Sequence, residues 1–194
     1  MSVVSILNKP PFGPLAIAAA LLLLQASVLF YCGQPLICAC GYVKLWEGDV
    51  WSSGMSQHLF DWYSFTHVMH GFLFYFLLWL VFPRTPVITR LLLALGIEVG
   101  WEILENSQWV IHRYREQALA AGYSGDSILN SLSDSLMMLF GFLIAWRLPV
   151  WAVVTMALAM ELFLAFAIHD NLTLNIINLI YPLDFLRNWQ SSVR

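Results

Sequence analysis

Five long runs of apolar residues divide the chain, and shorter polar or proline-containing segments separate them. These runs predict helices over residues 15–31, 63–82, 87–105, 127–146 and 150–168. Pro83, Pro86 and Pro149 stand between runs, where proline is expected to stop a helix. Each run has close to the roughly 20 residues that a helix needs to cross a bilayer. The pattern therefore predicts five transmembrane helices.

A sixth apolar segment, residues 172–183, is interrupted by Asn175, Asn178 and Pro182. It is too short to cross a bilayer alone, so we expect an interfacial, re-entrant or half-crossing helix. No repeat, low-complexity tract or linker divides the chain. The sequence thus predicts an all-α fold: a polytopic membrane helix bundle of five spans plus a short C-terminal helix, forming one integral-membrane domain over residues 1–194.

Composition supports the membrane assignment and excludes other classes. The chain is 60% hydrophobic and 11% charged, whereas a soluble domain carries about 25% charge. Nine tryptophans suit a protein with several membrane–water interfaces. The net charge of −3, without clustered cations, excludes a nucleic-acid partner. The lipid bilayer is the expected partner, and a homo-oligomer stays open.

The cations favour a cytoplasmic N-terminus, because Lys and Arg accumulate on the inner side of membranes. With the C-terminal segment returning inward, the inner side holds Lys9, Arg84, Arg90, Arg147, Arg187 and Arg194, and the outer side holds Lys44, Arg113 and Arg115. The preference disappears if the chain ends outside. Cys32, Cys38 and Cys40 then face outward, where Cys32 could pair with Cys38 or Cys40; equally, all three could be small apolar residues near the interface.

Ionisable side chains within the apolar runs are the most informative feature, because each costs at least about 2.5 kcal/mol at bilayer depth. Polar and ionisable side chains recur at helical spacing on one face of four runs or directly beside them. They are His67 and His70; Glu98, Glu102 and Glu105; Asp126, Asn130 and Asp134; and Glu161, followed by His169 and Asp170. Such residues usually face a partner or water. We therefore expect these faces to point into the bundle.

Depth along each helix indicates that the four polar faces meet. At about 1.5 Å per residue, Glu98, His70, Asp134 and Glu161 all lie about 10 to 12 Å below the outer interface. The sequence predicts one polar cavity open to the outer face, covered by the loops 33–59 and 106–125. Gly96 and Gly100 form a small-xxx-small pair, which predicts a close approach by a neighbouring helix.

Carboxylates and imidazoles together are a ligand set for a divalent metal, Zn, Mn or Fe. The candidate metal ligands are His67, His70, Glu102, Asp126, Asp134 and Asp170, and the candidate catalytic residues are Glu102, Glu105, Asp126 and His70. The candidate substrate-binding residues are Arg113, Arg115 and Trp62. The two arginines could bind a phosphate headgroup, or could instead neutralise Glu102 and Glu105.

The predicted function is a metal-dependent hydrolase or transferase that acts on an envelope lipid or isoprenoid. A second hypothesis is a small proton-coupled transporter, because chains of Asp, Glu and His relay protons in such proteins. A third is a non-catalytic membrane assembly factor, in which the polar faces hold the helices together by hydrogen bonds.

Several sequence blocks resemble a family of small bacterial inner-membrane proteins of uncharacterised function. The blocks are Ser56–Ser64, Trp101–Asn106, His112–Arg115, Gly122–Ser127 and His169–Leu172. The resemblance extends over nearly the whole chain from Cys32 onward. It implies a multi-pass protein of the bacterial cell membrane and assigns no catalytic residue.

Overall fold

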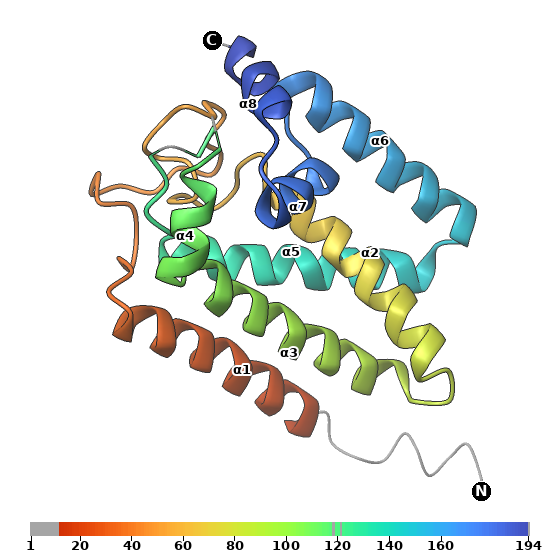
Figure 1. Cartoon of the computed structure of the whole chain (residues 1–194). Coiled ribbons are helices and arrows are strands. Elements are labelled where there is room, and N and C mark those ends of the chain that lie inside the picture. Colours follow the sequence, from red (N-terminus) through yellow and green to blue (C-terminus); the bar gives the residue numbers. More distant parts are fainter. Residues whose placement is uncertain (1–11, 118, 121, 194) are drawn as a thin grey trace, which may run out of the picture.

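The computed structural model describes residues 12–117, 119–120 and 122–193, and the regular secondary structure of this part of the chain is helical, with one isolated bridge between Trp46 and Phe60 in a loop. The helices are α1 Phe12–Tyr31, α2 Ser64–Val81, α3 Val87–Glu105, α4 Gln108–Tyr114, α5 Ile128–Arg147, α6 Val150–Ile168, α7 Leu172–Ile180 and α8 Asp184–Gln190, followed by the 3-10 turn Ser191–Val193. The all-α prediction is confirmed (Figure 1).

Four of the helices, α1, α2, α5 and α6, are long and apolar enough to cross a membrane. The remaining predicted span, residues 87–105, corresponds to α3. This helix has 19 residues but carries Arg90, Glu98, Glu102 and Glu105. It packs against α1, α2 and α5 within the bundle (Figure 1). The four apolar helices are consistent with a membrane protein, and the count of five spans stays a prediction.

Helix boundaries agree with the sequence pattern to within three residues, since proline and capping residues mark them. Ser127 and Asn171 accept backbone N–H groups at the starts of α5 and α7. The short C-terminal helix ends at Ile180, two residues before Pro182. The short helices α4 and α8 were not predicted. Two cations used to predict topology, Lys9 and Arg194, lie outside the described residues.

The helices α2 and α5 cross with their backbones in contact at Gly71 and Gly141. A Cβ on Gly71 would collide with backbone atoms of Met138 and Phe142, and one on Gly141 would collide with the backbone of Val68. The close approach predicted at Gly96 and Gly100 is wrong, because both face open space. The crossing brings together the two helices that carry His67 and Asp134.

The interior of the bundle divides into an apolar and a polar part. The apolar part is a core cluster that consists of Leu78, Ala94, Leu95, Val99, Met138 and Phe142. These residues lie toward one end of the bundle. At this end the connection 82–86 joins α2 to α3, and the connection 148–149 joins α5 to α6. The histidine and acidic residues of these helices lie toward their opposite ends, where the long loops join the bundle (Figure 1).

The segment after α6 turns back along that helix. His169 adopts a left-handed conformation with φ of 54°, and the N–H groups of Leu172 and Thr173 then donate to the Glu161 carboxylate at 3.0 and 3.3 Å. Glu161 precedes the end of α6 by seven residues, which corresponds to about 10 Å. The start of α7 is therefore held well below the end of α6, as a re-entrant or half-crossing helix would be.

The cysteine pairing differs from the expectation. Cys38 and Cys40 form the disulfide, and Cys32 is free and exposed. Cys32 directly follows α1, and its N–H donates to the Val28 carbonyl as the last helical hydrogen bond would. The other two cysteines lie further along the loop.

Candidate functional site

Two histidines from α2 meet two glutamates from α3 in the polar part of the bundle. His67 Nδ1 lies 2.7 Å from Glu98 Oε1 and 3.3 Å from Glu102 Oε1. His70 Nδ1 lies 3.1 Å from Glu98 Oε2. Both glutamates are completely buried. We call these four residues the His–Glu cluster.

The His–Glu cluster has more acceptor oxygens than donors. The Nδ1 of His67 carries at most one proton, and Glu98 Oε1 is the nearer of its two acceptors. Glu102 Oε2 accepts from Ser131 Oγ at 2.6 Å, but the buried Glu102 Oε1 has no hydrogen-bond partner among the described residues. A buried acceptor without a hydrogen-bond partner destabilises the folded protein unless a proton or a cation binds to it.

The separations within the cluster are compatible with a shared metal ion. Zinc binds nitrogen and oxygen ligands at about 2.0 to 2.2 Å, which places neighbouring ligands about 3.0 to 3.4 Å apart in octahedral or tetrahedral geometry. The nitrogen–oxygen distances of the His67–Glu98, His67–Glu102 and His70–Glu98 pairs run from 2.7 to 3.4 Å, and donor atoms of His67, His70 and Glu98 all lie within 4.8 Å of one another. Glu105 also has a carboxylate oxygen within 4.8 Å of donor atoms of His67 and Glu102.

A second layer of polar residues supports Glu102 from α1 and α5. Gln25 donates to Ser131 Oγ at 2.7 Å and accepts from Ser135 at 2.9 Å. Gln25 is fully buried and was not among the predicted site residues. Its signal in the sequence is a lone amide within an apolar run.

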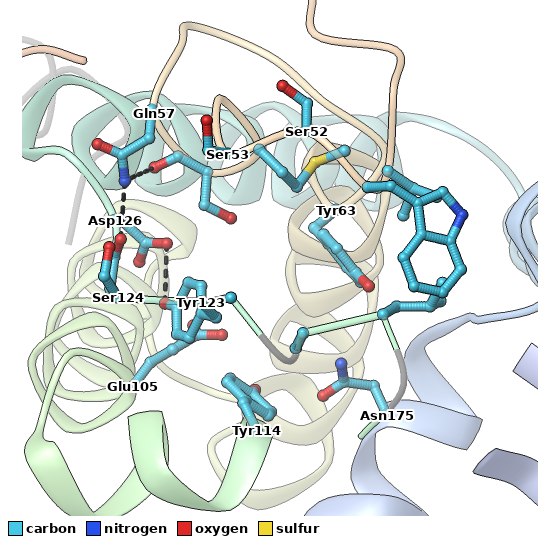
Figure 2. A pocket seen from close by; sticks show the side chains of 18 of the residues that line it. Ser52, Ser53, Gln57, Tyr63, Glu105, Tyr114, Tyr123, Ser124, Asp126 and Asn175 are labelled. Carbon is cyan, nitrogen blue, oxygen red and sulfur yellow. Dashed lines mark hydrogen bonds between the residues drawn. The ribbon is translucent and has the colours of Figure 1, made fainter. Parts of the chain in front are cut away.

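A cavity of about 180 Å³ adjoins the cluster at His67. Figure 2 shows polar and aromatic side chains from several elements around it. Four predicted site or polar-face residues line it: His67, Glu105, Asp126 and Asp134. The rest of the wall comes chiefly from residues 50–53, 55–57, 119–120 and 122–125, which belong to the two loops expected to cover the site.

Asp126 is the best-connected carboxylate of the cavity wall. It accepts from Asn106 Nδ2 at 2.7 Å and from the Tyr123 hydroxyl at 2.9 Å, the latter shown in Figure 2. Burial raises the pKa of Asp126 to about 6, and the two hydrogen bonds oppose this rise. Asn106, which the sequence reasoning missed, directly follows α3 and also accepts from the Asp126 N–H at 2.7 Å. A carboxyl with this pKa can exchange a proton near neutral pH.

Asp134 connects the cluster to the first loop. Its Oδ2 lies 3.9 Å from His67 Nε2, and its Oδ1 accepts from Ser64 Oγ at 3.1 Å. Ser64 in turn accepts from the N–H of Asp61 at 3.1 Å. Asp61 holds the loop by accepting from the Ser56 N–H, and burial raises the pKa of its carboxyl.

Asp170 and Glu161 are not part of the His–Glu cluster. Asp170 accepts from the Tyr63 hydroxyl at 3.0 Å, so it lies behind a residue of the cavity wall. Burial raises its pKa to about 6. Glu161 instead accepts the N–H groups at the start of α7.

The three predicted substrate-binding residues lie outside the cavity lining. Arg113 donates to the carbonyls of Leu179 and Ile180 at the end of α7, both at 2.9 Å, and pairs with Glu116. Arg115 donates to the carbonyl of Tyr123 at 2.6 Å. Trp62 donates to Gly48 and packs on Trp46 and Phe163.

Comparison with known proteins places these features in a family. A family model described as "Protein of unknown function (DUF2585)" matches residues 29–192. The chain belongs to this family. It is 50% identical to a UPF0314 protein of Agrobacterium fabrum over 177 residues, which is 91% of this chain and 89% of that protein. It is 49% identical to a UPF0314 protein of Sphingopyxis alaskensis over 175 residues, 90% of this chain and 93% of the relative. A UPF0314 protein of Rhizobium meliloti is 54% identical over 172 residues, 89% and 87% of the two chains. No solved structure matches the chain. The family confirms the resemblance seen in the sequence and assigns no activity.

Proposed function

We propose that the His–Glu cluster binds one divalent metal ion, through His67, His70, Glu98 and Glu102. The observation that carries this proposal is Glu102 Oε1, which is buried, lacks a hydrogen-bond partner and lies 3.3 Å from an imidazole nitrogen that Glu98 already engages. In the described part of the chain, neither glutamate pairs with lysine or arginine. A divalent cation neutralises two carboxylates and satisfies the remaining oxygen.

The metal would serve a hydrolase or transferase acting on an envelope lipid. A bound metal polarises a phosphoryl or carbonyl oxygen and lowers the pKa of water. Asp126, on the wall of the adjoining cavity, has a pKa of about 6 and fits the role of general base. The volume of about 180 Å³ suits part of a headgroup rather than a whole lipid.

The expected membrane arrangement fits such a substrate. In our proposal α1, α2, α3, α5 and α6 cross the bacterial cell membrane with the N-terminus in the cytoplasm, and α7 crosses half of it. The cavity then lies near the outer interface, where headgroups are found. Fusion of a periplasm-active reporter after Arg115 tests this orientation, and an inactive reporter would invert it.

Transport is less well supported. A proton pathway needs polar groups across the whole bundle, whereas the apolar core cluster around Leu95, Met138 and Phe142 fills the part beyond the His–Glu cluster. An assembly factor held together by polar contacts would not require a metal. Metal content therefore separates the proposed enzyme from an assembly factor.

Metal analysis of detergent-purified protein is the deciding experiment. We expect about one Zn, Mn or Fe ion per chain by mass spectrometry, and we expect Glu98→Gln and Glu102→Gln to reduce metal affinity at least tenfold. Glu161→Gln is the matched control, because it removes a partly buried glutamate outside the cluster. Absence of metal after dialysis against these ions, or equal loss in Glu161→Gln, would contradict the proposal.

The enzymatic part needs a separate assay. Metal-loaded protein is incubated with bacterial envelope lipids, and headgroup loss or transfer is followed by mass spectrometry. We expect a product with wild type and Glu161→Gln, and none with Asp126→Asn. A product that persists in Asp126→Asn would remove this carboxylate from the mechanism.

A further inference from the structure

The cavity beside the His–Glu cluster has a charge opposite to the one expected for binding phosphate. Three carboxylates, those of Glu105, Asp126 and Asp134, belong to its wall, and the lining contains no lysine or arginine among the described residues. The two arginines expected to bind phosphate instead donate to backbone carbonyls elsewhere. The described lining thus offers carboxyl oxygens, and no guanidinium or lysine ammonium donor, to a bound group.

Aromatic rings form much of the remaining wall. Tyr63, Tyr114, Tyr123 and Trp51 all line the cavity, and Figure 2 shows the three tyrosines arranged around its interior. The rings of Tyr114 and Tyr123 meet edge to face, with centroids 5.5 Å apart. Aromatic faces attract cations, and walls of this kind recognise quaternary ammonium groups in proteins.

Neutral donors orient the carboxylates of Asp126 and Asp134. Asp126 is bound by Asn106 and Tyr123 and Asp134 by Ser64, while His67 Nε2 lies 3.9 Å from Asp134 Oδ2. These neutral donors orient the oxygens without cancelling a negative charge. The wall is therefore preorganised and keeps its attraction for a positive ligand.

We propose that the cavity binds an organic ammonium group, so that the lipid acted on carries a zwitterionic headgroup of the phosphocholine or phosphoethanolamine class. The identification of the carrier as a lipid rests on the function proposed above. His67 belongs both to the cavity wall and to the His–Glu cluster. A headgroup with a phosphate next to its ammonium group could therefore meet the metal and the aromatic acidic wall together.

Calorimetric titration with choline tests the ammonium site, and 3,3-dimethyl-1-butanol is its neutral isostere. With detergent-purified wild type treated with EDTA, we expect choline to bind at least tenfold more tightly than the alcohol. We expect Asp126→Asn and Glu105→Gln each to weaken choline binding at least fivefold, whereas Glu161→Gln leaves it unchanged. Ethanolamine, titrated in parallel, shows whether the cavity prefers a primary or a quaternary ammonium group.

Removal of metal distinguishes this inference from the proposed function. Choline binding in EDTA-treated protein supports the ammonium site even if no metal is found. Equal binding of choline and its isostere, or tighter binding of inorganic phosphate than choline without metal, would overturn it. In metal-loaded protein we expect lysophosphatidylcholine to bind more tightly than free choline. Equal affinities would identify a free amine as the ligand and refute the lipid part.

Discussion

Replacing Gly71 by alanine tests whether the α2–α5 crossing is as tight as the structure indicates. A Cβ at residue 71 would overlap backbone atoms of Met138 and Phe142, which cannot move independently of α5. The same substitution at Gly96, also within a helix, meets nothing within 4 Å in the chain. The pair separates the effect of helix packing from the effect of removing a glycine.

The two substitutions are expected to differ in sign. Within a helix, alanine is more favourable than glycine by about 0.5 to 1 kcal/mol. Gly96→Ala should gain up to this amount. Forcing an extra carbon into a closely packed contact costs about 1 to 3 kcal/mol, and the colliding atoms at Gly71 are backbone. Gly71→Ala should therefore lose about 1 to 2 kcal/mol net.

Thermal unfolding in detergent, followed by tryptophan fluorescence, measures the difference. We expect the midpoint of Gly71→Ala to fall below that of wild type, and that of Gly96→Ala to stay equal or rise. Because α2 carries His67 and His70, and Ser131 of α5 donates to Glu102, Gly71→Ala should also weaken metal binding. Equal midpoints for the two variants would refute the close crossing.

Two further predictions concern the C-terminal segment. The pKa of Asp170 is about 6 in the folded protein against an ordinary value of 3.8, so its stabilisation is present below about pH 4 and is lost as the pH rises through about 6. The whole loss is on the order of 3 kcal/mol, of which about 1.4 kcal/mol falls between about pH 5 and 7.5. The fall in melting temperature over this range should therefore be smaller in Asp170→Asn than in wild type, while the exposed Asp184→Asn should follow wild type. Arg113→Ala should accelerate hydrogen exchange at the end of α7, because Leu179 and Ile180 lose a charged donor; Arg115→Ala should not, and equal exchange in the two variants would contradict this role.

Helix positions and the depth of the site were predictable from the sequence. Run length and proline place the helices, since crossing a bilayer and stopping a helix are local requirements. Helical spacing puts Glu98 and Glu102 on one face, and the rise per residue puts His70 and Glu98 at one depth. These two measures place the residues at one level and are compatible with the contacts found between α2 and α3.

Which faces turn toward each other could not be predicted. Rotation of a helix about its axis is set by packing with other helices, and depth carries no information on it. The sequence therefore pointed to Gly96 and Gly100, while the close contact is at Gly71 and Gly141. For the same reason Arg113 was assigned to a substrate, although it binds the end of α7.

The contrast between Glu161 and Glu102 explains why a single acid within an apolar helix is weak evidence for a site. Both are glutamates within long apolar helices, and the sequence treats them alike. Glu161 has both oxygens engaged by N–H groups at the start of α7, where a helix attracts negative charge. Glu102 lies between imidazole and carboxylate groups with one oxygen left unbound. The first is accounted for by the fold alone, whereas the second requires a proton or a metal, and this difference makes Glu161→Gln the appropriate control for Glu102→Gln.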